Sequence, residues 1–145
     1  RPEEIIGGEA RGALRGSSKY MLAARCYKHD PATSDSKLAE VYLRGSWCTR
    51  AEALRDRERQ CQAEAALHLE QALNSGSVEP KRRHTVLYLV GELYRRLGMF
   101  DVAVDYFDQA LHVSPEICQP RLQALIERQL EAARARRSEN MVIRE

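Results

Sequence analysis

The chain has 145 residues, of which 43% are hydrophobic, 6% aromatic and 30% charged, and its net charge is +2 at pH 7. This length predicts one domain, and a charge so close to neutral argues against a nucleic acid as the partner. No apolar run approaches the ~18 residues that a membrane span requires, so we expect no membrane partner.

The first part of the chain predicts a lead-in followed by a short helix. Residues 1–16 contain four glycines and little periodicity, so we expect a loosely ordered segment. Because the chain begins at Arg1 without Met, we expect a fragment of a longer protein, and because no secretory signal is present we expect a cytoplasmic location. Ser17 or Ser18 can cap a helix that ends near His29.

The middle of the chain predicts two long helices. Residues 30–34 are a turn cluster, after which Ser34 or Asp35 can cap a helix over about 37–54. Residues 56–58 are a plausible break, although the stretch can also stay helical, and a further helix runs to about Asn74, where residues 74–76 stop it. We interpret 37–74 as one enlarged helical repeat.

The strongest pattern lies in residues 87–115. Apolar residues recur every three or four positions on two successive segments, as on the buried faces of two helices. Gly98 separates them and is suited to end a helix in a left-handed conformation. Small residues stand where the two helices must approach, at Gly91, Ala103 and Ala110.

Residues 84–115 resemble a tetratricopeptide repeat, a motif of two antiparallel helices. The usual Trp and the usual Leu of the motif are replaced here by Leu87 and Val90. The matching positions are Leu87, Val90, Gly91, Tyr94, Gly98, Phe100, Ala103, Phe107, Ala110 and Pro115. The resemblance implies an all-α fold of antiparallel helical hairpins stacked in a right-handed superhelix.

The C-terminal part predicts a capping helix over 119–137, begun by Pro120, and a tail over 138–145. The helix carries one apolar stripe opposite a charged face, which suits a cover for the open end of a stack. The stripe consists of Leu122, Leu125, Ile126 and Leu130. With these elements, residues 17–137 form a single predicted helical domain.

A wider resemblance covers residues 17–137. The phrases KYMLAARCY, KLAEVYLRGSWCTRAEA and LYLVGELYRRLGMFDVAVDYFDQAL are similar to the C-terminal region of a bacterial family of uncharacterised proteins. That family carries a cysteine-rich, zinc-binding segment before the helices, which this sequence does not contain. The resemblance implies no activity that can be assigned to this chain.

Catalytic and metal chemistry find little support in the sequence. The four cysteines form no CxxC pair, and Cys26 with His29 is a single pair without a second one at ligand spacing. We therefore predict reduced, structural cysteines and neither a metal site nor a cofactor. No nucleophile elbow, phosphate loop or carboxylate pair is recognisable, so we predict that the chain is not an enzyme.

Binding of a protein or peptide is the predicted function. In a stack of hairpins the first helix of each pair lines a concave surface, and Trp, Tyr and Arg are enriched in binding hot spots. The candidate residues are Leu43, Trp47, Arg50, Thr85, Tyr88, Glu92, Arg95 and Arg96. Their arginines suit a peptide that carries a carboxylate.

Two alternatives remain open at the level of sequence. Trp47 can be a core residue instead of a groove residue, and the arginines can be simply solvated. The chain can also be a structural or oligomerisation module that supports the absent N-terminal metal-binding region, for example as a homodimer. The sequence names no partner.

Overall fold

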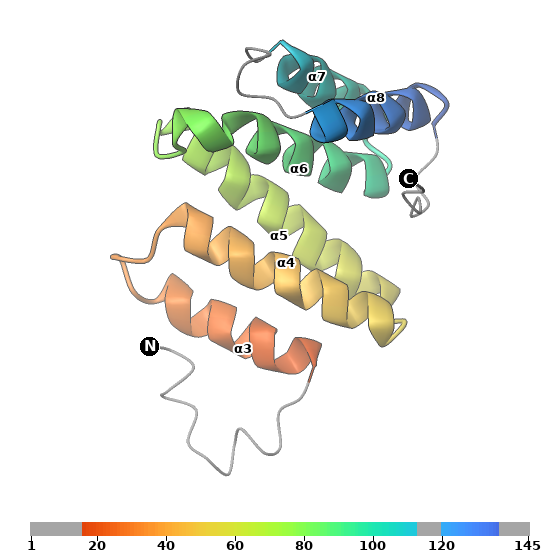
Figure 1. Cartoon of the computed structure of the whole chain (residues 1–145). Helices are drawn as coiled ribbons and strands as arrows, with labels where there is room; N and C mark the ends of the chain where they lie inside the picture. The colour runs from red at the N-terminus through yellow and green to blue at the C-terminus, as the bar shows by residue number, and fades with distance from the viewer. Residues whose placement is uncertain (1–15, 113–119, 137–145) are drawn as a thin grey trace. The chain divides into compact units, whose positions relative to one another are not determined.

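The computed structural model describes residues 16–112 and 120–136 of the chain. Within these residues all regular structure is helical and no strand is present (Figure 1). The predicted all-α class is therefore confirmed. Residues 1–15 of the predicted lead-in, Pro115 at the end of the predicted repeat, and the tail 138–145 lie outside the described residues.

The chain divides into two compact units, Arg1–Gln71 and Ala72–Glu145. The first contains α3 (Ser17–Lys28), α4 (Asp35–Ala51) and most of α5 (Arg55–Asn74), and the second contains α6 (Arg83–Arg96), α7 (Phe100–Leu111) and α8 (Pro120–Arg134). A short 3-10 turn, Pro80–Arg82, leads directly into α6. The single domain over 17–137 and the enlarged repeat over 37–74 stay predictions.

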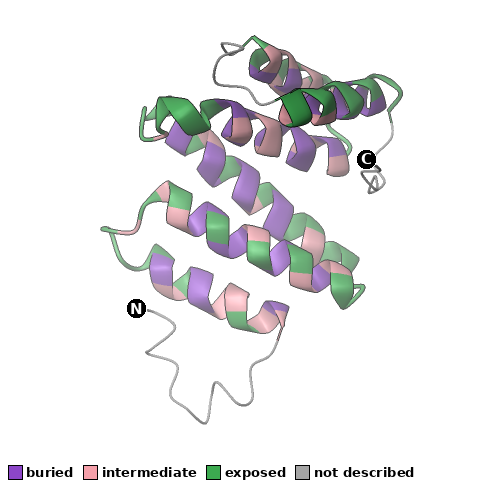
Figure 2. Ribbon diagram, viewed as in Figure 1, coloured by how far each residue is buried: buried purple, intermediate pink, exposed green. Residues whose placement is uncertain are grey.

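The first unit is held by small buried side chains and by polar contacts between its helices. Ala23 and Ala39 are among its buried residues, and α3 packs against α4 (Figure 2). From α5, the ring of His68 stacks on Tyr42 at 6.0 Å between centroids, and its Nδ1 lies 2.8 Å from Oδ1 of Asp35. These contacts connect α5 to the first two turns of α4.

The N-terminus of α3 is capped by a residue that is distant in sequence. The backbone N–H and the hydroxyl of Ser17 both donate to the carboxylate of Glu52, at 2.9 and 2.8 Å. Arg57 donates to the same hydroxyl at 3.1 Å. Because the first backbone N–H groups of a helix have no partner within it, this carboxylate supplies a missing acceptor.

The break between α4 and α5 lies at residues 52–54, so the predicted break at 56–58 was wrong, and the alternative that 56–58 stay helical is confirmed. Ala53 adopts φ 58, and the N–H groups of Ala53 and Leu54 donate to the carbonyls of Arg50 and Thr49. This is the Schellman pattern of a helix end, formed here without glycine. Asp56 belongs to the first turn of α5, where negative charge suits the helix dipole.

In the second unit, α6 and α7 form the antiparallel hairpin that the sequence predicts. Gly98 has φ 82 and ends α6 with the same Schellman pattern. A Cβ at Gly91 would lie 2.7 Å from Cε1 of Phe107, so only glycine lets the two helices approach this closely. Ala103, Phe107 and Ala110 are fully buried.

The predicted stripe of α8 faces inward over part of its length. Ile126 and Leu130 are buried where α8 packs against α7, whereas Leu122 and Leu125 are half-buried. Among the helices that the structure describes, none has both the length and the apolar character needed to cross a bilayer.

Candidate interaction site

The predicted binding residues fall on one helix of each unit. Leu43, Trp47 and Arg50 lie on α4, whereas Thr85, Tyr88, Glu92, Arg95 and Arg96 lie on α6. The structure describes each set of residues within its own unit. The single concave face that would combine the two sets stays a prediction.

Trp47 is on the outside of α4. Its exposed fraction is 56%, and Leu43, one turn before it, is half-buried. The inner face of the helix is occupied by residues such as Tyr42, Gly45 and Thr49, which lie on the opposite side of the 3.6-residue turn. Trp47 is therefore not a core residue, and an indole with this exposure is available for a contact.

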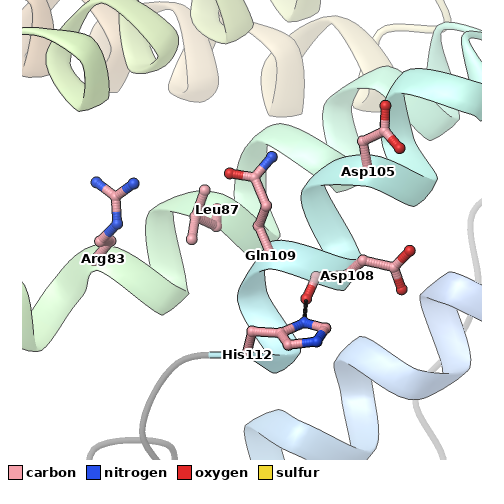
Figure 3. Close-up of a pocket in the computed structure, with 6 residues that line it drawn as sticks. All are labelled: Arg83, Leu87, Asp105, Asp108, Gln109 and His112. Atoms are coloured by element: carbon pink, nitrogen blue, oxygen red, sulfur yellow. Dashed lines mark hydrogen bonds between the residues drawn. The ribbon is translucent and has the colours of Figure 1, made fainter.

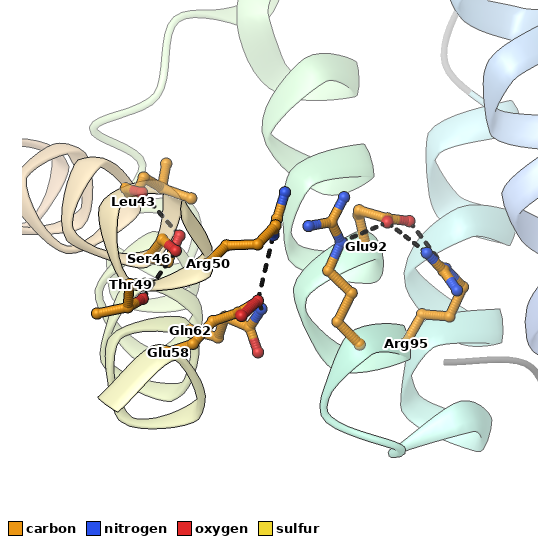
Figure 4. Close-up of polar contacts among 9 residues, drawn as sticks. Leu43, Ser46, Thr49, Arg50, Glu58, Gln62, Glu92 and Arg95 are labelled. Atoms are coloured by element: carbon orange, nitrogen blue, oxygen red, sulfur yellow. Dashed lines mark hydrogen bonds and ion pairs between the residues drawn. The ribbon is translucent and has the colours of Figure 1, made fainter. Parts of the chain in front are cut away.

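The guanidinium of Arg50 is held next to Trp47 by α5. Its Nε donates to Oε1 of Glu58 at 3.2 Å, and Nε2 of Gln62 donates to the same oxygen at 3.3 Å (Figure 4). Among residues 16–112 and 120–136, no hydrogen-bond or ion-pair partner is found for the Nη groups of Arg50. The side chain is thus oriented and still has donors to offer.

The charged candidate residues on α6 bind one another. Arg95 is fully buried, and its Nε and Nη2 donate to the two carboxylate oxygens of Glu92 at 3.0 and 2.6 Å (Figure 4). Arg96 donates to Glu92 at 2.8 Å from the edge of this pair. Glu92 and Arg95 therefore serve the interior of the second unit, and neither offers its charge at the surface.

The other two candidates on α6 are half-buried. The ring of Tyr88 lies 6.1 Å from that of Phe107, centroid to centroid. Burial, with a smaller contribution from the nearby charge of Glu92, raises the pKa of Tyr88 far above its usual value, so this phenol stays protonated. Thr85 is half-buried in the first turn of the helix.

A pocket of about 610 Å³ lies between α6 and α7 and was not singled out from the sequence (Figure 3). Nδ1 of His112 lies 2.6 Å from the backbone oxygen of Asp108. Since a carbonyl oxygen can only accept, the Nδ1–H of His112 is the donor of this hydrogen bond. The lining combines one buried leucine with charged and polar groups, namely Arg83, Leu87, Asp105, Asp108, Gln109 and His112. Residues 105, 108, 109 and 112 follow one another at helical spacings and so share one face of α7. This spacing is the sequence signal that could have identified the α7 side of the pocket.

The three cysteines that the structure describes are free thiols. Cys26, Cys48 and Cys61 are free, and burial raises the pKa of Cys61 to about 11, which keeps it a thiol. In the part of the chain that the structure describes, no group of three or more His, Cys, Asp and Glu side chains is placed to hold a metal ion. Cys118 lies outside that part.

Comparison with known proteins places the chain in a family. No curated protein and no solved structure matches it. A family model, however, matches residues 8–133, which is most of the chain and includes every candidate residue on α4 and α6. The chain therefore belongs to the family described as uncharacterized proteins conserved in bacteria (DUF2225).

Proposed function

We propose that this chain is a non-catalytic scaffold that binds a protein or peptide, with Trp47 at the centre of its binding surface. The main observation in support of this proposal is that the indole of Trp47, on a regular helix, is 56% exposed. A large aromatic side chain contributes most when a partner removes it from water, because its apolar area is large and its rotamer entropy small. The half-buried Leu43, one turn before it on α4, extends the apolar area beside it.

We further propose that the helices form a tetratricopeptide-like superhelix. The support is local: the hairpin of α6 and α7, its glycine-ended first helix and the close approach at Gly91 agree with the packing rule of that motif. In such a stack α4 and α6 are the first helices of their hairpins, which line the concave surface. The proposed surface then comprises Leu43, Trp47 and Arg50 with Thr85, Tyr88 and Arg96.

A photo-crosslinking experiment tests the proposed surface. A photoreactive residue is placed at position 47, and in a matched variant at Leu67, an apolar residue of α5 with 48% exposure. Both variants are irradiated in a lysate of a bacterium that has a member of this family, and melting curves confirm that both are folded. We expect a discrete adduct from position 47 only. The same adducts from both positions, or none from position 47, would remove Trp47 as the binding centre.

Variants without a photoreactive residue test the same surface by capture of the partner. Arg95 is unsuitable, because the substitution of a buried ion-pair partner damages the fold before it tests a surface. Trp47→Ala removes a side chain that is 56% exposed, so in a capture experiment on the otherwise unmodified chain we expect the partner to be lost, while the melting temperature remains within a few degrees of wild type.

A further inference from the structure

The residues that surround Trp47 on α4 are apolar or positively charged. Neighbours on a helix surface are three and four positions apart, and for Trp47 these are Leu43, Arg44, Arg50 and Ala51. The side chains of Arg44 and Arg50 are 54% and 33% exposed. No acidic residue stands at these four positions.

The carboxylates that bind these two arginines come from outside these four positions. Glu40 bonds to Nη2 of Arg44 at 2.9 Å from one turn back along α4, and Glu58 bonds to Nε of Arg50 from α5. Glu58 takes only Nε of Arg50, so the two Nη groups remain to form a fork with an incoming carboxylate. The indole therefore lies between two cations, each of which has one carboxylate partner.

The spacing of these cations indicates the geometry of the partner. Arg44 and Arg50 are six residues apart, which is about 9 Å along a helix axis and about 120° around it, with Trp47 midway between them. A helical partner matches this with carboxylates six or seven positions apart and an apolar residue between them on the same face.

We propose that the Trp47 surface binds an acidic amphipathic helix in which a large aliphatic side chain lies midway between two carboxylates. The aliphatic side chain covers the indole, and the two carboxylates accept from Arg44 and Arg50. This inference rests on the proposed function, since it names the class of partner for the same surface.

Three synthetic helical peptides of equal length test this partner class. They lack tryptophan and carry a leucine flanked at a spacing of three by two Glu, two Gln or two Lys residues. Trp47 is the single tryptophan of the chain, so its fluorescence reports binding at this surface alone. At low salt we expect the Glu peptide to bind about tenfold more tightly than the Gln peptide, and the Lys peptide to bind most weakly.

Variants identify the source of this preference. We expect the double variant Arg44→Gln, Arg50→Gln to bind the Glu and Gln peptides equally, whereas Arg25→Gln, an exposed arginine on α3, retains the preference. Equal binding of the Glu and Gln peptides by the wild type would overturn the acidic preference and leave the proposed function intact. If no peptide changes the fluorescence, the acidic-helix inference fails, while the crosslinking at position 47 still decides the proposed function independently.

Discussion

Replacing Gly91 with alanine places a methyl group inside the contact between α6 and α7. The new Cβ would lie 2.7 Å from Cε1 and 2.8 Å from Cδ1 of Phe107, whereas carbon atoms pack best at about 3.5–4.0 Å. The ring of Phe107 is fully buried and also lies against Tyr88, so it has little room to withdraw. The helices must therefore separate, or the ring must leave its preferred rotamer.

Two opposing effects decide the sign of this substitution. Alanine stabilises a helix interior by about 1 kcal/mol relative to glycine. Overpacking a close contact costs about 1–3 kcal/mol, and the short distances at Gly91 point to the upper part of that range. We expect a net loss of about 1–2 kcal/mol in the free energy of unfolding, or a fall of about 3–6 °C in melting temperature.

The assay is urea unfolding followed by circular dichroism, with Gly45→Ala as the matched control on α4. A Cβ at Gly45 would lie 3.2 Å from Sγ of Cys61, a milder contact, so we expect that variant to remain within about 0.5 kcal/mol of wild type. In a Phe107→Leu background the Gly91→Ala substitution should become neutral or stabilising. The reasoning is refuted if Gly91→Ala raises the stability in both backgrounds, as an ordinary helical substitution would.

Three further predictions concern buried and capping groups. Arg95→Met removes the main partner of the buried Glu92 carboxylate, so we expect urea unfolding to show a loss of about 3 kcal/mol in the free energy of unfolding. For Arg96→Met we expect a loss of about 1 kcal/mol, and equal losses for the two variants would contradict this reasoning. The hydrogen bonds from Ser17, first the backbone N–H and then the hydroxyl, lower the pKa of Glu52, so the wild type should exceed Glu52→Gln in stability at neutral pH. That difference is complete above the ordinary value of 4.5 and should vanish as the pH falls through the lowered pKa, which melting curves over pH can show; a difference independent of pH would exclude the carboxylate cap. Burial raises the pKa of Cys61 to about 11, so iodoacetamide at about pH 8 should modify the half-buried Cys48 well before Cys61. Mass spectrometry of the peptides measures the two rates of modification, and equal rates in the native chain would argue against the burial of Cys61.

The ends of the helices show how far the sequence pattern reaches. The end of α6 at Gly98 was predicted and confirmed, because glycine adopts positive φ without strain. The end of α4 uses the same hydrogen bonds, but Ala53 occupies the left-handed position. An alanine gives no signal for that conformation, so the predicted break lies four residues too late.

The candidate site shows a different limit. Helical periodicity assigns Trp47 and Arg95 each to a face of its own helix, but it does not say which face another element covers. In the structure the indole is open to solvent, whereas Arg95 is enclosed with Glu92. Arg44 was not among the predicted binding residues, although the predicted helix over 37–54 already puts it three positions before Trp47.

The cap on α3 has a consequence for the order in which the first unit forms. Ser17 and the carboxylate that caps it are 35 residues apart, so at roughly 5–20 residues per second α3 leaves the ribosome about 2–7 s before its cap is synthesised. An isolated helix of 12 residues is only marginally stable in water. Among α3, α4 and α5, α3 is synthesised first. We nevertheless expect it to become stable last of these three, after the turn between α4 and α5 has closed.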